Sequence, residues 1–279
     1  MRNTVVLTSL AMIAFAANSV LCRFALGAGH IDAASFASVR VISGALALAA
    51  IVIYRTDGPV ERDANWRSAL ALFVYMVCFS FAYLSLGAGT GALILFAAVQ
   101  LTMFIVALRS GETFSPLSWA GLLLAIAGLV YLVSPGVTAP EPGGAVLMTI
   151  AGIAWGVYSL LGRSVQDPTR ATAWNFVLSV PLVIVTSLLF MQQFHLTTTG
   201  VALAVASGIV ASGIGYVIWY AALRGLAATS AATVQLSVPV IAAIGGVLLL
   251  SEDVTLRLGV ASLATLGGVA IVLLQRRAN

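Results

Sequence analysis

The chain has no lysine, only nine acidic residues, two cysteines and two histidines. Charged residues make up 8% of its 279 residues, whereas a soluble domain carries about 25%. Hydrophobic residues account for 61%, and the mean hydropathy is +1.09. A soluble fold of this length could not bury so much apolar surface, but lipid can solvate it. The composition therefore predicts an integral membrane protein.

The scarcity of reactive side chains excludes several classes of function. Cys22 and Cys78 lie on separate apolar stretches and have no metal or redox spacing. His30 and His195 fall in predicted connections, so we expect no metal and no cofactor. A base and a nucleophile at membrane depth are both missing, which argues against an enzyme. All 13 basic residues are arginines scattered among short connections, which argues against a nucleic-acid partner.

None of the nine acids lies inside an apolar stretch. An ionised carboxylate in a bilayer is costly and is normally kept only for function. A protein that moves a solute across the bilayer without such groups has no obvious proton carrier. We therefore expect facilitated diffusion down a gradient.

Ten apolar stretches are long enough to span a bilayer as helices, which needs about 20 residues each. The predicted fold is therefore all-α and transmembrane. The first stretch is interpreted as a helix and not as a cleaved signal peptide. The expected spans are 4–24, 33–54, 67–86, 89–108, 115–133, 144–163, 171–190, 199–222, 227–250 and 256–275.

The arginines predict the orientation. If the N-terminus is cytoplasmic, only Arg23 and Arg257 fall outside, and Arg40 lies within a span. The positive-inside rule favours this arrangement, and an even number of spans then places both termini in the cytoplasm. We expect a bacterial-type plasma (inner) membrane. The arginines that fall inside are Arg2, Arg55, Arg62, Arg67, Arg109, Arg163, Arg170, Arg224, Arg276 and Arg277.

The chain also repeats itself. Residues 14–23 align with residues 154–163, and Glu112 matches Glu252 at the same shift. Residues 1–136 and 143–279 therefore read as two five-helix units, and an odd number of helices makes the second unit inverted. Inverted repeats are typical of alternating-access transporters, which bind their substrate near the midplane.

Polar side chains at membrane depth are candidates for the substrate site. Arg40 either attracts a substrate carboxylate or bonds helix-end carbonyls and outer headgroups. Asn18 either faces a cavity or makes an interhelical hydrogen bond. Gln100 and Gln235 occupy equivalent helices of the two repeats, and their amides could bind a zwitterion or a neighbouring backbone.

Aromatic side chains form two predicted faces. Tyr75, Phe79 and Tyr83 recur at a spacing of four residues, as do Ser212, Tyr216 and Tyr220 in the second repeat. Packing is the default meaning, but hydroxyls at mid-depth need partners, which favours an inward orientation. The candidate substrate-binding residues are Asn18, Arg40, Tyr75, Phe79, Tyr83, Gln100, Trp155, Tyr158, Tyr216 and Gln235.

Three residues are candidate hinges or gates. Pro181 and Pro239 should kink their helices, because proline cannot donate to the preceding turn. Gly89 lies in a glycine cluster, Gly87, Gly89 and Gly91, at the turn between the third and fourth spans. Such small residues let helices approach closely.

Several short runs resemble the EamA repeat of the drug/metabolite transporter superfamily. They are residues 227–232, Val238-Pro239-Val240, Leu250-Ser251-Glu252 and Gly267-Gly268-Val269, with Asn18-Ser19 and Val39-Arg40-Val41 in the first repeat. Within the superfamily the chain is most similar to YddG-type exporters of aromatic and other neutral amino acids. The resemblance implies ten helices, a central cavity and peripheral fifth and tenth helices. Val99 or Gln100 stands where the second repeat has Pro239, so the two gates need not move symmetrically.

The leading hypothesis is an exporter of neutral, aromatic or aliphatic, amino acids or related metabolites, which works by alternating access. An exporter of drugs or nucleobase-like compounds is the alternative on the same fold. A membrane scaffold or an intramembrane enzyme is the alternative of a different class. The expected partners are a small-molecule substrate and the lipid bilayer, with the protein a monomer or a weak dimer.

Overall fold

The computed structural model describes residues 2–55, 65–162, 165–226 and 233–275. Within these ranges the regular structure is helical, apart from one isolated β-bridge between Ile31 and Leu196. The helices are α1 (Arg2–Gly27), α2 (Ala33–Arg55), α3 (Trp66–Ala82), α4 (Ala88–Arg109), α5 (Pro116–Val133), α6 (Pro142–Leu161), α7 (Pro168–Leu189), η2 (Met191–Gln193), α8 (Thr198–Ala206), η3 (Ser207–Ile214), α9 (Gly215–Leu223), α11 (Ser237–Leu250) and α12 (Leu256–Gln275).

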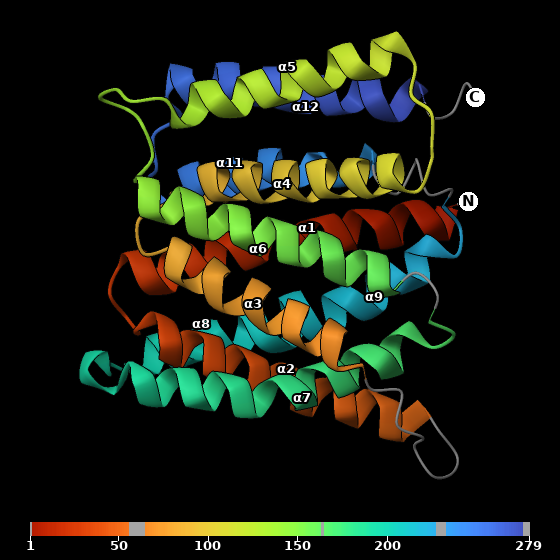
Figure 1. Cartoon of the computed structure of the whole chain (residues 1–279). Coiled ribbons are helices and arrows are strands. Elements are labelled where there is room, and N and C mark those ends of the chain that lie inside the picture. The colour runs from red at the N-terminus through yellow and green to blue at the C-terminus, as the bar shows by residue number, and fades with distance from the viewer. Residues whose placement is uncertain (1, 56–64, 163–164, 227–232, 276–279) are drawn as a thin grey trace.

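The helices confirm an all-helical membrane protein. In the described part of the chain, nine helical runs are long and apolar enough to cross a membrane, and α3 is a shorter apolar helix. The start of α1 and the end of α12 lie at the same end of the bundle (Figure 1). The number of spans and their orientation in a membrane remain predictions. Arg163, the linker 56–64 and the family-like run 227–232 lie outside the described residues.

Loop residues define where several helices begin. α5, α6 and α7 each start with a proline, and the residue before it caps the helix: Ser115, Glu141 and Asp167. Proline is suited to the first helical position because that position needs no N–H donor. The side-chain oxygens accept hydrogen bonds from backbone N–H groups of the first turn. Two of the loop acids, Glu141 and Asp167, therefore have a structural role outside the apolar spans.

The two halves of the chain are packed against each other across the bundle. α2 lies on α7, α3 on α6, and α4 on both α6 and α11, while α1 contacts α11, α8 and α9. α5 and α12 pack mainly on each other and form one edge of the bundle (Figure 1). Gly121 and Gly268 let the α5 and α12 backbones approach closely. A central group of eight long segments therefore surrounds any path through the molecule.

The eighth predicted span, 199–222, is not a uniform α-helix. It runs from Thr198 to Leu223, but residues Ser207–Ile214 form a π-helix between α8 and α9. Gly208 sits in this π-helix, where a Cβ atom would clash with the backbone of Arg40. A π-helical segment inside an α-helix is uncommon and is often found at functional sites.

Candidate functional site

A large cavity reaches one end of the bundle, which we call the open end. The cavity measures about 850 Å³ and extends from the middle of the molecule to the end of α2, the α6–α7 connection and the end of α9. Arg55, Asp167 and Arg224 lie along its rim, and Trp155 and Tyr216 lie at its inner limit. Its volume falls within the roughly 300–1,000 Å³ that small-molecule sites occupy.

The inner limit of the cavity is a cluster of rings, which we call the aromatic plug: Phe15, Tyr75, Trp155 and Tyr216. Trp155 contacts Tyr75 with ring centroids 4.9 Å apart and Tyr216 at 5.2 Å. Phe15 packs edge-on against Trp155 at 6.5 Å and against Tyr216 at 5.9 Å. The four rings come from α1, α3, α6 and α9, so the plug joins helices of both halves.

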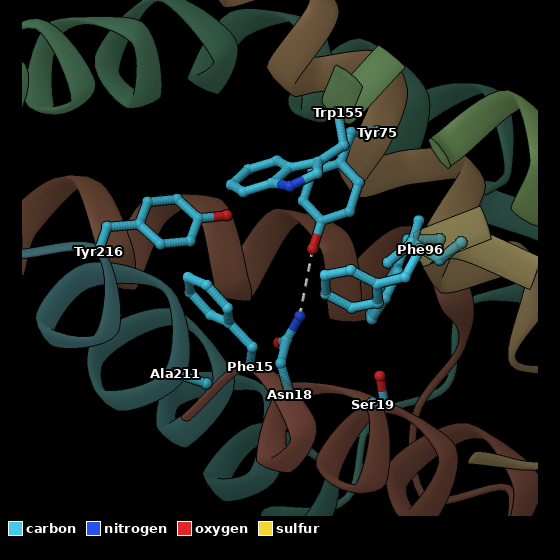
Figure 2. Close-up of a pocket in the computed structure, with 10 residues that line it drawn as sticks. Phe15, Asn18, Ser19, Tyr75, Phe96, Trp155, Ala211 and Tyr216 are labelled. Atoms are coloured by element: carbon cyan, nitrogen blue, oxygen red, sulfur yellow. Dashed lines mark hydrogen bonds between the residues drawn. The ribbon is translucent and has the colours of Figure 1, made fainter. Parts of the chain in front are cut away.

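A small inner pocket lies behind the plug. It measures about 20 Å³, which is room for one water molecule. Asn18, Ser19 and Phe79 line it together with the plug residues, and Figure 2 shows the Tyr75 hydroxyl turned toward Asn18. Because Trp155 and Tyr216 line both spaces, these two side chains separate the cavity from the inner pocket.

Tyr75 is the centre of a buried hydrogen-bond network. Its hydroxyl oxygen accepts a bond from Asn18 Nδ2 at 3.3 Å and another from Arg40 Nη2 at 3.1 Å. Asn18 Oδ1 in turn accepts from Ser207 Oγ at 2.6 Å, and Arg40 Nε donates to Ser212 Oγ at 3.2 Å. The π-helix therefore supplies hydroxyl partners for both polar groups of the first half.

Arg40 is fully buried, with 0% of its surface exposed. Its guanidinium carbon lies 5.0 Å from the Phe79 ring centroid and 5.3 Å from that of Tyr75. Its Nη1 atom has no hydrogen-bond partner among the described residues. The side chain is therefore too deeply buried to reach outer headgroups. Its Nε and Nη2 atoms donate to the hydroxyls of Ser212 and Tyr75 and not to helix-end carbonyls.

Both predicted glutamines line the large cavity. Gln100 on α4 is 8% exposed, and its Nε2 atom has no hydrogen-bond partner in the part of the chain that the structure describes. Gln235 lies just before α11. A buried amide donor without a partner costs free energy, so Gln100 is a candidate for binding a substrate oxygen.

A second polar cluster lies in the cavity wall. Tyr158 and Thr172 share a hydrogen bond between their hydroxyls at 3.1 Å, and Thr172 Oγ1 lies 3.5 Å from the Tyr220 hydroxyl. Trp155 packs on Tyr158 with ring centroids 5.4 Å apart. The wall thus offers aromatic faces together with hydroxyl groups.

At the opposite end of the bundle, which we call the sealed end, an ion pair joins helices around a pocket of about 190 Å³. Arg23 Nε donates to Glu252 Oε1 at 3.1 Å. This ion pair joins α1 to the segment that follows α11. Glu252 Oε2 accepts the backbone N–H of Ala88 at 2.8 Å, at the start of α4. Arg23 Nη1 also donates to the carbonyl oxygens of Tyr83 and Leu84, each at 3.2 Å. We call this group the Arg23–Glu252 lock.

The remaining predicted residues occupy different places. Tyr83 lines neither central space; its hydroxyl donates to the carbonyl of Ala88 at 3.3 Å near the lock. Gly89 packs so closely on Ala243 of α11 that a Cβ atom would lie 2.6 Å from the Ala243 Cβ. Pro181 is exposed inside α7 and lines no pocket described above. Pro239 lies in the first turn of α11, three residues after a break in the helix at Leu236.

The structure brings most of the predicted residues together. Gln100, Trp155, Tyr158, Tyr216 and Gln235 line the cavity, and Asn18, Tyr75 and Phe79 line the inner pocket. Sequence reasoning missed Phe15, Trp219, Thr172 and Ser207. It placed Ser212 on an aromatic face and rejected it as a nucleophile, but did not propose it as a partner of Arg40. The glycines that follow Ser207 and Ser212, Gly208 and Gly213, were a signal for irregular helix, but nothing in the sequence paired these serines with Asn18 and Arg40.

The comparisons with known proteins agree with this architecture. The model of the EamA-like transporter family matches residues 2–134 and again residues 142–274. The uncharacterized protein PA1977 of Pseudomonas aeruginosa is 49% identical over 99% of this chain and 96% of its own length. An uncharacterized transporter of Archaeoglobus fulgidus is 28% identical over 95% of this chain and 96% of its own length.

More distant relatives extend the comparison. The chloroplastic WAT1-related protein At3g02690 of Arabidopsis thaliana is 27% identical over 77% of this chain and 57% of its own length. A solved crystal structure with 23% identity superposes with a TM-score of 0.67 over 96% of this chain and 97% of that one, which shows the shared fold. The family match over both halves and the nearly full-length relatives lead to one conclusion: the chain belongs to the EamA-like transporter family.

Proposed function

We propose that the protein is an alternating-access carrier that exports neutral amino acids, aromatic or aliphatic, or closely related metabolites across a bacterial-type inner membrane. One observation carries the proposal. A cavity of about 850 Å³ opens at one end, stops at the aromatic plug and is closed at the other end by the Arg23–Glu252 lock. A carrier needs this asymmetry, because a path open at both ends would be a channel.

The lining of the cavity supports amino acids as the cargo. Trp155, Tyr158 and Tyr216 present apolar faces for a hydrophobic side chain, and Gln100 offers an amide donor without a partner. An apolar surface for the side chain and a donor for a carboxylate oxygen are two of the contacts that a neutral amino acid makes. The resemblance to YddG-type exporters supports the same class. The predicted orientation places the open end in the cytoplasm, where a cargo for export would enter.

We further propose facilitated transport without proton coupling. Among the described residues, the carboxylate that lines the cavity is that of Asp167 at the rim. Asp167 caps α7 and pairs with Arg170 at 3.5 Å, so it already has a structural role. Transport that changes with an imposed proton gradient would contradict this part of the proposal.

Counterflow in proteoliposomes tests the function. Vesicles preloaded with unlabelled leucine, phenylalanine or tryptophan receive labelled tryptophan with no ion gradient. The proposal expects transient accumulation of label that depends on the preload. A preload-independent equilibration would indicate a channel, and no uptake above that of empty vesicles would remove aromatic amino acids as cargo.

A second candidate cargo is a flat aromatic compound such as a drug or a nucleobase. It is favoured by the tryptophans and tyrosines of the cavity wall, which include Trp219 and Tyr220 as well as Trp155. Stacking alone would hold such a compound without a charge or a zwitterion. Preloading the same vesicles with adenine or uracil separates the two cargo classes.

A further inference from the structure

Arg40 is a buried cation without a counter-ion. The ion pairs Arg23–Glu252 and Arg170–Asp167 do not involve Arg40. The guanidinium is surrounded by the neutral groups Ser212, Tyr75 and Phe79. Burying an unpaired charge inside a membrane is expensive, and such a group is kept where an anion binds at some stage of function.

The free part of the guanidinium has the geometry for a carboxylate. Nη1 has no partner, and the adjacent Nη2 is held by a single neutral hydroxyl, that of Tyr75. The two terminal nitrogens of an arginine can donate parallel hydrogen bonds to the two oxygens of one carboxylate. A charged acceptor would bind more strongly than the Tyr75 hydroxyl does, because charge-assisted hydrogen bonds are the stronger kind.

Tyr75 links this buried charge to the cavity. Its ring packs on Trp155 in the aromatic plug, and its hydroxyl accepts a hydrogen bond from Asn18 (Figure 2). The same hydroxyl accepts a hydrogen bond from Arg40 Nη2. A cargo side chain that displaces Trp155 therefore also moves the ring whose hydroxyl occupies Nη2. Release of Nη2 and exposure of Arg40 would follow from one rearrangement.

We propose that Arg40 is a second station for the cargo, which binds an organic monocarboxylate after the plug has moved, and that the Tyr75 hydroxyl occupies its place in the empty protein. This inference rests on the proposed carrier function and names the group that the carrier recognises. In the conformation described, the space behind the plug holds only about one water, so the carboxylate cannot yet reach Arg40. The cavity therefore binds the apolar part of the cargo first, and Arg40 binds its carboxylate afterwards.

Benzoate and benzamide provide a probe pair that differs in charge but hardly in shape. Each compound is added to the purified full-length protein in detergent, and its binding is measured from the shift in the melting temperature of the protein. Wild type is expected to bind benzoate at least about tenfold more tightly than benzamide. One charge-assisted hydrogen bond is expected to lower the dissociation constant by about this factor. Chloride at the same concentrations distinguishes an organic carboxylate from any small anion.

Two variants with opposite expected effects keep the test independent of simple damage. Arg40→Gln should abolish the preference for benzoate, whereas Tyr75→Phe should strengthen benzoate binding several-fold, because it removes the hydroxyl that competes for Nη2. Arg67→Gln, an exposed arginine in the first turn of α3, removes the same charge and should leave the preference unchanged. If Arg40→Gln does not fold, Tyr75→Phe still tests the proposal by itself, because stronger benzoate binding is expected only if the Tyr75 hydroxyl competes for Nη2.

The outcomes are distinct. A folded Arg40→Gln protein that still prefers benzoate, a Tyr75→Phe protein that binds it no better than wild type, or chloride that matches benzoate would each overturn the proposal. Failure of tryptophan counterflow with an intact, Arg40-dependent benzoate preference would remove aromatic amino acids as cargo and leave the Arg40 site standing. Active tryptophan counterflow without an Arg40-dependent preference for benzoate would support the carrier function and overturn the Arg40 site.

Discussion

The two ends of the bundle are held by different kinds of contact. At the sealed end, charged side chains and backbone groups at helix termini bond each other across α1, α3, α4 and α11. At the open end, helices that are packed by apolar residues in the middle diverge around a wide cavity with aromatic walls. A partly exposed ion pair contributes little net free energy, because water replaces each partner when it breaks. The sealed end can therefore open at a small cost.

The same comparison explains the two arginines that depart from the positive-inside pattern. Arg23 donates to carbonyl oxygens just after α3, and Arg257 donates to the carbonyls of Leu132 and Ser134 at the end of α5. Both side chains satisfy acceptors that a helix C-terminus leaves free. Their presence at the predicted outer end has a structural reason, so they do not weaken the orientation that the other arginines predict.

The largest expected effect comes from forcing the sealed end apart at Gly89. In Gly89→Val the new Cβ would meet the Ala243 Cβ at 2.6 Å and its Cα at 2.9 Å, so α4 and α11 must separate. We expect counterflow to fall at least about tenfold, because overpacking against backbone cannot relax by a rotamer change. Gly259→Ala is the matched control, since a Cβ there meets nothing within 4 Å. Normal counterflow in Gly89→Val would mean that the two helices are not closely held during transport.

The second prediction breaks the Arg23–Glu252 lock. Ser19 lines the inner pocket and is 1% exposed. A cysteine at this position, in a protein from which Cys22 and Cys78 have been removed, therefore reports opening of the sealed end. Adding Glu252→Gln should raise the rate of labelling by a membrane-impermeant maleimide about three- to tenfold, as loss of one ion pair shifts the equilibrium. Asp253→Asn removes the neighbouring charge as a control. Equal rates with and without Glu252→Gln would show that the lock does not hold this end closed.

The third prediction concerns the open end. Gln100→Leu removes the amide donor that has no partner, so the empty protein should gain about 2 °C in melting temperature. The KM for tryptophan counterflow should rise about fivefold, because the cargo loses a hydrogen bond. A rise in stability without a change in KM would show that Gln100 does not contact the cargo. The aromatic walls would then be the part of the cavity that binds it.

The smallest expected effect is a pH dependence at the sealed end. The backbone N–H groups of Gly144 and Gly143 lower the pKa of Glu141, the cap of α6, from its ordinary value of 4.5. A carboxyl whose pKa is lowered by folding stabilises the fold above its unfolded pKa, and the contribution is lost as the pH falls through the lowered value. The difference in melting temperature between wild type and Glu141→Gln should thus be constant from pH 7 to about pH 5 and shrink below about pH 4. A difference in melting temperature that grows below about pH 4 would contradict the stabilising role of the ionised Glu141 as the cap of α6.

Much of the architecture could be predicted from the sequence because each signal is local. Span positions follow from apolar runs, and the described helices start or end within a few residues of most predicted bounds. Trp155 and the glutamines Gln100 and Gln235 were recognisable because a polar or amphipathic side chain in an apolar run has few alternatives to a cavity or a partner helix. The structure places all three in the cavity wall.

The contacts of the site could not be predicted in the same way. The partners of Arg40 and Asn18 are serines of a π-helix more than 170 positions later in the chain, and serine is common in membrane helices as a packing residue. Within the π-helix, Gly208 packs closely on the backbone of Arg40, a contact that no local pattern records. Glu252 was expected to make a structural contact at the membrane surface, but its pairing with Arg23 spans 229 positions.

The sequence by itself determined that this chain is a helical membrane protein, where its apolar helices lie and which few polar side chains they carry, because the hydrophobic effect acts on composition and periodicity. Only the tertiary structure decided which end is closed, which rings separate the cavity from the inner pocket and that Arg40 is left without a counter-ion. Those properties depend on the distances between helices that are far apart in the chain. A hydrogen bond, an ion pair or an empty volume exists only once packing has fixed those distances.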